Sequence, residues 1–102
     1  MKTLEQVRLE LREGEFDYSQ HAFRRAVERN ISELEIRESG ANAIIVEEYP
    51  DDKYGPTLLV LRFTSEQRPL HIQVSVADVP LIRIVTLYEP ESGEWEDYVR
   101  RR

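Results

Sequence analysis

The chain begins with segments in which apolar residues recur at helical spacing. In the first segment, Thr3 and the glutamine three residues later match a capping box, and Gly14 follows the last apolar position. This pattern predicts a helix over residues 4–13.

Two further helices follow from the same kind of capping residues. Asp17 or Ser19 can cap the second helix, which we expect to run to about Asn30, because asparagine tolerates the left-handed conformation that ends many helices. A second capping box begins at Ser32, and Gly40 is placed to end the third helix.

After the third predicted helix the periodicity changes to that of strands. Four short runs rich in β-branched and aliphatic residues are separated by segments with proline, glycine or aspartate. The runs cover residues 43–49, 57–63, 70–76 and 81–88. Their short connections impose antiparallel pairing, because a parallel crossover needs a dozen residues or more.

This order of elements predicts an α+β fold, with N-terminal helices packed on a four-stranded antiparallel β-meander. We expect a single domain over residues 1–102. The third run alternates strictly between apolar and polar residues, and its polar face carries His71, Gln73 and Ser75. The lone tryptophan, Trp95, is expected to pack back onto the sheet or the first helix, with a base-stacking platform as the alternative.

Composition narrows the class of protein. Hydrophobic residues make up 40% of the chain and charged residues 33%, which is ordinary for a globular protein. Cysteine is absent, so disulfides and thiolate metal sites are excluded. No apolar run approaches the roughly 20 residues that a membrane helix needs, and the start of the chain lacks an apolar secretion segment. We therefore expect a cytoplasmic protein with no membrane contact.

The charge balance bears on nucleic-acid binding. A formal net charge of −6, from 20 acidic and 14 basic residues, opposes nonspecific attraction to nucleic acid. Only a local basic patch would favour RNA. The second predicted helix offers one, and the run Arg100-Arg101-Arg102 offers another, although such a terminal run is more often a solvated tail.

The second predicted helix carries a stripe of titratable and cationic side chains. His21, Arg25 and Arg29 fall at positions i, i+4 and i+8, which places one imidazole and two guanidinium groups along one side. Such a row suits a phosphate-handling site, whereas surface ion pairing with nearby glutamates is the ordinary alternative for the arginines. The opposing apolar stripe is expected to pack inward; it consists of Ala22, Phe23, Ala26 and Val27.

No other recognised catalytic pattern is present. The two histidines lie fifty positions apart, no carboxylate stands at a ligand spacing from either, and neither a glycine-rich phosphate loop nor a nucleophile turn occurs. We expect no metal and no cofactor. The acid–base set that remains consists of His21, Arg25, Arg29, His71, Thr86 and Tyr88. RNA cleavage through the 2′-hydroxyl needs such groups: a base, a cation for the phosphate and an acid for the leaving oxygen.

Each member of this set also has an ordinary explanation. His21, near a helix start, can bond a neighbouring carboxylate or backbone group. His71 faces either solvent or the floor of a groove. Thr86 and Tyr88 are common strand residues.

Several motifs occur in an order that resembles a known family. They are Ser19-x-His21-Ala22, Arg25 and Arg29 followed by Ile31-Ser32, Pro69-Leu70-His71-Ile72, Thr86-Leu87-Tyr88-Glu89-Pro90, and Trp95. Together they span about residues 18–100 and resemble a small prokaryotic family, domain of unknown function 4258. That family is similar to the RelE-like toxins, within a group of metal-independent RNases that includes barnase, EndoU and colicin-type domains.

The resemblance carries implications for fold, site and partners. It implies a RelE-like arrangement of helices followed by a four-stranded antiparallel sheet, and a toxin–antitoxin setting with RNA as substrate and a small antitoxin as partner. The catalytic set that it implies, carried over by position, is His21, Arg25, His71, Thr86 and Tyr88. The phosphate-binding residues that it implies are Arg25 and, as an outer cation, Arg29.

Three functional hypotheses follow. The first is a metal-independent endoribonuclease of toxin type, in which one of His21 and His71 is the general base and the other the general acid. In that hypothesis Arg25 stabilises the phosphate and Tyr88 orients it. The second, motivated by the net charge of −6, is a noncatalytic binding or regulatory module on the same fold. The third is a homodimer in which an exposed strand edge or helix stripe is the interface.

Overall fold

The computed structural model describes residues 1–53 and 55–102 of the chain. Three helices come first, and they are α1 (Leu4–Arg12), α2 (Gln20–Glu28) and α3 (Glu33–Gly40). Within the described residues, none of the helices has the length and apolar character that crossing a membrane requires.

The helices begin where their capping residues predict. Thr3 and Ser32 each form a complete capping box with the side chain three residues later. The hydroxyl of Ser19 caps α2 by accepting a hydrogen bond from the backbone N–H of Ala22 at 3.0 Å. Asn30 follows the end of α2 with a φ of 52°, the left-handed conformation that the sequence predicts there.

The main sheet has five strands. They are β1 (Phe16–Tyr18), β2 (Ile44–Tyr49), β3 (Thr57–Phe63), β4 (Pro69–Ser75) and β5 (Ile82–Tyr88), in the spatial order β1-β5-β4-β3-β2. Neighbours from β2 to β5 pair antiparallel, whereas β1 pairs parallel to β5. The α+β class is thus confirmed, and the predicted four-stranded antiparallel sheet is corrected to a five-stranded mixed sheet. β1 has only three residues, too few for a period of two to show in the sequence.

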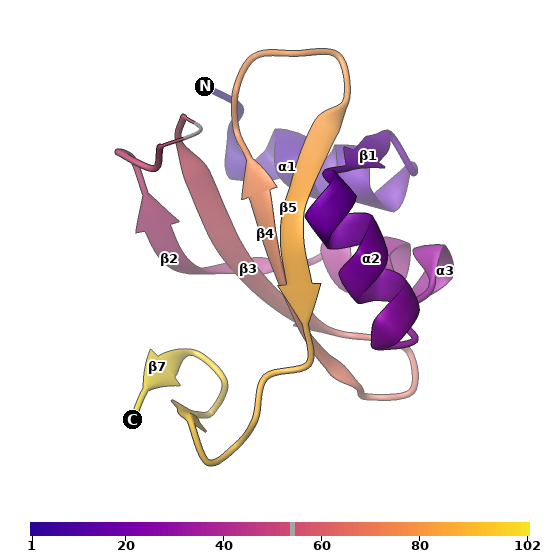
Figure 1. Ribbon diagram of the computed structural model, residues 1–102, viewed down its shortest axis with the longest axis vertical. Helices are drawn as coiled ribbons and strands as arrows, with labels where there is room; N and C mark the ends of the chain where they lie inside the picture. The colour runs from indigo at the N-terminus through magenta and orange to yellow at the C-terminus, as the bar shows by residue number, and fades with distance from the viewer. Residues whose placement is uncertain (54) are drawn as a thin grey trace.

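The core lies between one face of the sheet and the helices (Figure 1). α1 and α3 pack against each other, and both contact strands of the sheet. The fully or nearly fully buried apolar side chains of this core include Val7, Leu11 and Ile36 from helices and Val60, Leu70, Ile72, Val74, Ile82, Ile84 and Leu87 from strands. Every second residue of β4 points into this core, so the intervening residues face the other side of the sheet.

Gly40 ends α3 at the closest approach of α1 and α3. A Cβ atom built on Gly40 would lie 2.3 Å from the Cβ of Leu11, which is closer than two carbon atoms can pack. The glycine is therefore explained by the helix crossing rather than by a left-handed cap.

α2 covers the edge of β5 beyond the end of β1. The backbone N–H of Ser19 donates to the carbonyl of Ile84 at 3.0 Å, and its hydroxyl donates to the carbonyl of Val85, also at 3.0 Å. At the other end of the helix, the guanidinium of Arg29 donates to the carbonyl of Leu87 at 2.8 Å. The residues that flank α2 thereby satisfy carbonyls of β5 that would otherwise lie at an open sheet edge.

The apolar stripe of α2 is only half buried, which corrects the expectation that all of it packs inward. Ala22 and Ala26 are 0% and 7% exposed and face the sheet, whereas Phe23 and Val27 are 59% and 67% exposed. The two small residues let the helix lie close to β5, and the two larger ones are turned to its outer side.

Candidate functional site

The sheet face that points away from α1 and α3 is the polar one. Opposed pairs on it join His71 to Tyr88 and Gln73 to Thr86. Ser75 follows two residues after Gln73 on the same face of β4. This outer face therefore brings three of the predicted site residues together at adjacent positions of β4 and β5.

His71 is fully buried and both of its ring nitrogens have partners. Nε2 lies 2.6 Å from the carbonyl oxygen of Tyr98, and Nδ1 lies 3.1 Å from the hydroxyl of Tyr88. A carbonyl only accepts, so Nε2 carries the hydrogen and Nδ1 accepts the hydroxyl proton of Tyr88. Burial lowers the pKa of His71 and raises the pKa of Tyr88, which keeps the imidazole neutral and the phenol protonated.

A small carboxyl-terminal hairpin covers His71. It consists of β6 (Trp95–Glu96) and β7 (Arg100–Arg101), and it lies on the side of the sheet away from α1 and α3 (Figure 1). The Trp95 ring meets the His71 ring edge to face, with centroids 4.5 Å apart, and is only 3% exposed. The prediction that Trp95 packs back onto the sheet is confirmed. His71 therefore faces neither solvent nor the floor of an open groove, the two settings that the sequence suggested, because the hairpin covers it.

The hairpin is fastened to β2 by one charged side chain. Arg101 donates two hydrogen bonds of 3.0 Å to the carboxylate of Glu47, and its guanidinium lies 4.7 Å from the centre of the Trp95 ring. Tyr49 donates its hydroxyl proton to the same carboxylate. The bond from Arg101 is the main reason that the pKa of Glu47 is lowered, and the same pair raises the pKa of Arg101.

His21 lies in a different part of the outer face. Its exposed imidazole lines a hollow of about 470 Å³ together with Ser19, Ser75, Arg83 and Val85. Ser75 is four residues from His71 along β4, a separation of about 13 Å at the rise of an extended strand. The structure therefore places the two imidazoles in separate surroundings, at the two ends of β4.

The two arginines of the predicted stripe already have protein partners. Arg25 pairs with Glu28 at 2.7 Å, one turn further along the same helix. Arg29, besides its bond to β5, lines a hollow of about 430 Å³ with Tyr88 and three glutamates, which are Glu89, Glu91 and Glu94. Arg29 and Tyr88 thus lie side by side in acidic surroundings.

Sequence reasoning does not single out Arg83 or Arg68, and it places Ser75 on the polar face of its strand without giving it a role in a site. Arg83 and Ser75 stand at polar positions of alternating strands, so the pattern carried a signal for their face but none for their joining His21. Arg68 contacts the carboxylate of Glu35 at 3.0 Å, that of Glu89 at 2.8 Å, and two backbone carbonyls at the end of α2. Its contacts are those of a structural clamp.

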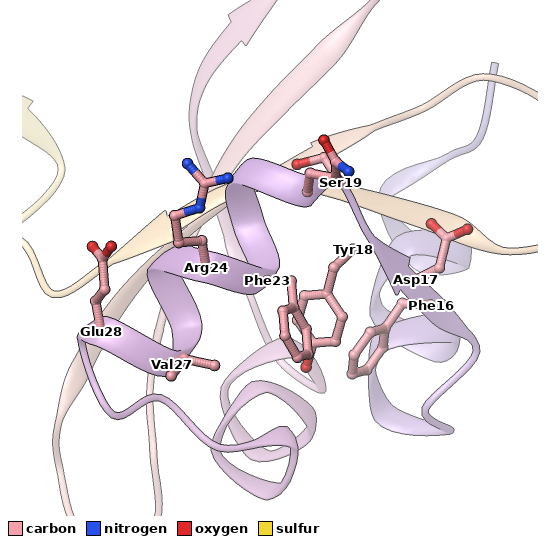
Figure 2. A pocket seen from close by; sticks show the side chains of 9 residues that line it. Phe16, Asp17, Tyr18, Ser19, Phe23, Arg24, Val27 and Glu28 are labelled. Atoms are coloured by element: carbon pink, nitrogen blue, oxygen red, sulfur yellow. The ribbon is translucent and has the colours of Figure 1, made fainter.

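A third hollow, with a largely apolar lining, lies between β1 and the outer side of α2. It measures about 770 Å³, and Figure 2 shows the rings of Phe16, Tyr18 and Phe23 gathered at its centre. The Tyr18 ring contacts both phenylalanines edge to face, at centroid distances of 5.7 and 5.9 Å. The exposed side chain of Val27 extends the apolar surface along the helix, and Arg24 lies beside it.

Metal-ligating side chains do not cluster in the described part of the chain. No group of three or more histidine, cysteine, aspartate or glutamate side chains there is arranged to hold an ion.

Comparison with known proteins gives one match. Residues 18–89 match a family described as domain of unknown function (DUF4258), over more than half of the chain. No curated protein and no solved structure is significantly similar to it. The matched range contains His21, His71 and Tyr88, and it ends before the hairpin that covers His71.

Proposed function

We propose that this chain, which belongs to the family described as domain of unknown function (DUF4258), is a metal-independent endoribonuclease of the RelE-like toxin type. One observation carries the proposal: the exposed imidazole of His21 lines a hollow beside Ser75, which stands on the sheet face that also carries Thr86 and Tyr88. The guanidinium of Arg29, just after α2, lines a neighbouring hollow together with Tyr88. A base, hydroxyl groups and cations are what the attack of a 2′-hydroxyl on its own phosphate requires.

In this proposal His21 is the general base, because it is exposed whereas His71 is buried. His21 takes the proton of the 2′-hydroxyl, whose oxygen bonds to the phosphorus while the bond to the 5′-oxygen breaks and that oxygen takes a proton from solvent water. The products are a 2′,3′-cyclic phosphate and a 5′-hydroxyl. His71 acts as a positioning residue, since its Nδ1 accepts the proton of Tyr88 and fixes the direction of that hydroxyl.

The test is cleavage of RNA by chelator-treated protein. Free RNA and ribosome-bound RNA are incubated with the protein, and the new ends are analysed for 2′,3′-cyclic phosphate. Loss of a general base lowers the rate by about 100-fold or more, so His21→Asn is expected to show that loss. Gln20→Asn, a change of the preceding exposed side chain of α2, is the control and keeps the wild-type rate.

The positioning role of His71 has its own readout. His71→Gln, Tyr88→Phe and the double variant are expected to lose a similar amount of activity, because the two side chains act through one hydrogen bond. Absence of cyclic phosphate ends on every RNA, together with unimpaired growth of cells that express the protein, would exclude the nuclease function.

A second candidate is a noncatalytic module that binds a partner protein. Two observations favour it: His71 is sealed with both ring nitrogens bonded, and Phe23 and Val27 leave an apolar surface open beside α2. In a toxin–antitoxin setting the partner is a small antitoxin encoded by the adjacent gene, with apolar side chains that fill the hollow of Figure 2.

Co-purification with the product of the adjacent gene tests this candidate. Phe23→Ser is expected to abolish the complex, whereas Leu9→Ser, which changes an exposed apolar residue of α1, leaves it intact. Sedimentation of the chain alone separates this from a homodimer: a mass that rises with concentration in the wild type and not in Phe23→Ser would make the partner a second copy.

A further inference from the structure

We propose that the hollow lined by Ser19, His21, Ser75, Arg83 and Val85, called here the Arg83 hollow, binds the phosphate group of a phosphate ester. Its volume of about 470 Å³ lies within the range of small-molecule sites in proteins. The claim that the ester is RNA rests on the proposed function; the claim that the hollow takes a phosphate rests on the side chains that line it.

The guanidinium of Arg83 has most of its donors available. In the described part of the chain its ion pair is a loose one, 3.6 Å from the carboxylate of Asp17, and the side chain is 55% exposed. Arg68 and Arg101, by contrast, are each held by two or more short bonds to carboxylates or carbonyls. A guanidinium with a free edge binds phosphate through two parallel N–H···O bonds, which is its preferred geometry for that anion.

His21 offers the second group. Its imidazole is exposed and forms no hydrogen bond or ion pair with the described residues, so both ring nitrogens are open to a ligand. A phosphate oxygen accepts a hydrogen bond from an N–H of the imidazole ring.

The two serines have different parts in the hollow. Ser19 is committed to the fold, since its hydroxyl donates to the carbonyl of Val85 and caps α2. Ser75 accepts one long contact of 3.4 Å from the backbone N–H of Ala77, which leaves its hydroxyl proton to donate. Ser75 is therefore the hydroxyl that a bound phosphate engages.

Asp17 sets the strength of binding. Its Oδ2 faces Arg83, while its Oδ1 is buried with no hydrogen-bond partner in the described structure. This carboxylate repels an anion, so the phosphate approaches the edge of the Arg83 guanidinium that Asp17 does not occupy. We expect weak, saturable binding that strengthens when Asp17 is replaced by Asn.

The experiment is a titration followed by nuclear magnetic resonance, with inorganic phosphate and uridine 3′-monophosphate as probes and chloride at matched ionic strength as the reference. The expected result is a saturable shift of the His21 imidazole and Ser75 amide signals that chloride does not cause. The shift is expected to disappear in Arg83→Gln. Arg12→Gln is the matched control, because Arg12 is 56% exposed and pairs with a single carboxylate, and it keeps the shift.

The outcomes separate this proposal from the nuclease function. Saturable phosphate binding that depends on Arg83, with no RNA cleavage, supports the Arg83 hollow and contradicts the nuclease. RNA cleavage with unchanged rate in Arg83→Gln, and no phosphate shift, overturns the hollow and leaves the nuclease. Identical shifts in Arg83→Gln and Arg12→Gln, or none in the wild type, likewise overturn the hollow.

Discussion

His71 is a neutral imidazole held in one tautomer by two partners, and this makes the stability of the protein depend on pH. Burial lowers its pKa below the ordinary value of about 6.5. Below that pH the unfolded chain takes up a proton that the folded chain still excludes. The free energy of unfolding is therefore expected to fall as the pH drops from about 6.5 toward the folded pKa, by up to about 1.4 kcal/mol per pH unit.

Urea unfolding at about pH 7.5, 6.5 and 5.5 measures this dependence. His71→Gln is expected to flatten it, since glutamine does not titrate. The window lies above the titration of Glu47, whose pKa is lowered by Arg101 and which contributes at more acidic pH. A wild-type slope in His71→Gln would show that the imidazole is not the responsible group.

Gly40 makes the contact between α1 and α3 sensitive to a single methyl group. In Gly40→Ala the new Cβ meets the Leu11 side chain at 2.3 Å, so one helix has to move. Overpacking of this kind is expected to lower the free energy of unfolding by about 1–3 kcal/mol in urea. Gly93→Ala is the control, because its Cβ would enter open space, and a change there is expected to stay within about 0.5 kcal/mol.

Single residues also show how much of the site the sequence predicts. The alternation of β4 correctly assigns His71 to the polar face of the strand. It does not reveal that the ring is buried, because the cover comes from Trp95 and Tyr98, more than twenty residues further along the chain. The sequence does not predict that Arg83 belongs to a site for a similar reason. The other cationic or titratable residue of its hollow, His21, belongs to a helix in the other half of the chain.

At the scale of elements, the carboxyl-terminal hairpin is short and locally strained. β6 and β7 have two residues each, and the turn between them places Asp97 and Tyr98 at φ values of 53° and 64°. The left-handed conformation costs about 1–2 kcal/mol for residues other than glycine, asparagine and aspartate, so the strain falls mainly on Tyr98. The hairpin therefore depends on its side-chain contacts, with the Arg101–Glu47 pair as the strongest charged one.

Trp95 is the one tryptophan of the chain, so its fluorescence reports on this hairpin. Arg101→Gln is expected to shift the emission to longer wavelength and to increase quenching by acrylamide, while the urea midpoint changes little, because an ion pair near the surface contributes about 1 kcal/mol or less. Arg100→Gln is the control, because the Arg100 side chain is 76% exposed and its ion pair with Glu96 is a long one of 3.8 Å. Emission that is unchanged in Arg101→Gln would mean that apolar packing alone holds the hairpin.

Among the elements, length decided what could be predicted. The three helices and four longer strands have caps, periodicity or turn residues that the sequence displays. β1 has none of these, because three residues cannot show a period, and its parallel pairing depends on the position of β5. The predicted burial of the apolar stripe of α2 is right for Ala22 and Ala26, which face the sheet. It is wrong for the larger Phe23 and Val27, which are exposed.

At the scale of the whole molecule, the two faces of the sheet differ in polarity and in what covers them. One face is buried under α1 and α3, and the other carries the Arg83 hollow at one end and the covered His71 at the other. The net charge of −6 is consistent with this division, because the acidic residues near Arg29 and Tyr88 leave little of the outer face positive. Any RNA contact is thus local rather than spread along a basic groove.

This locality predicts how RNA affinity responds to salt. Each phosphate neutralised by a protein cation contributes about −0.7 to the slope of log affinity against log salt for a single strand. With Arg83 as the cation in contact, the slope is expected to be roughly −0.7. Fluorescence anisotropy with a short labelled RNA at several salt concentrations measures it, and Arg83→Gln is expected to make it shallower, with Arg12→Gln as the control. A slope of about −4 or steeper would require several further phosphate contacts. In that case the cations of α2 or of the terminal arginines would have to leave their carboxylate partners to bind the strand.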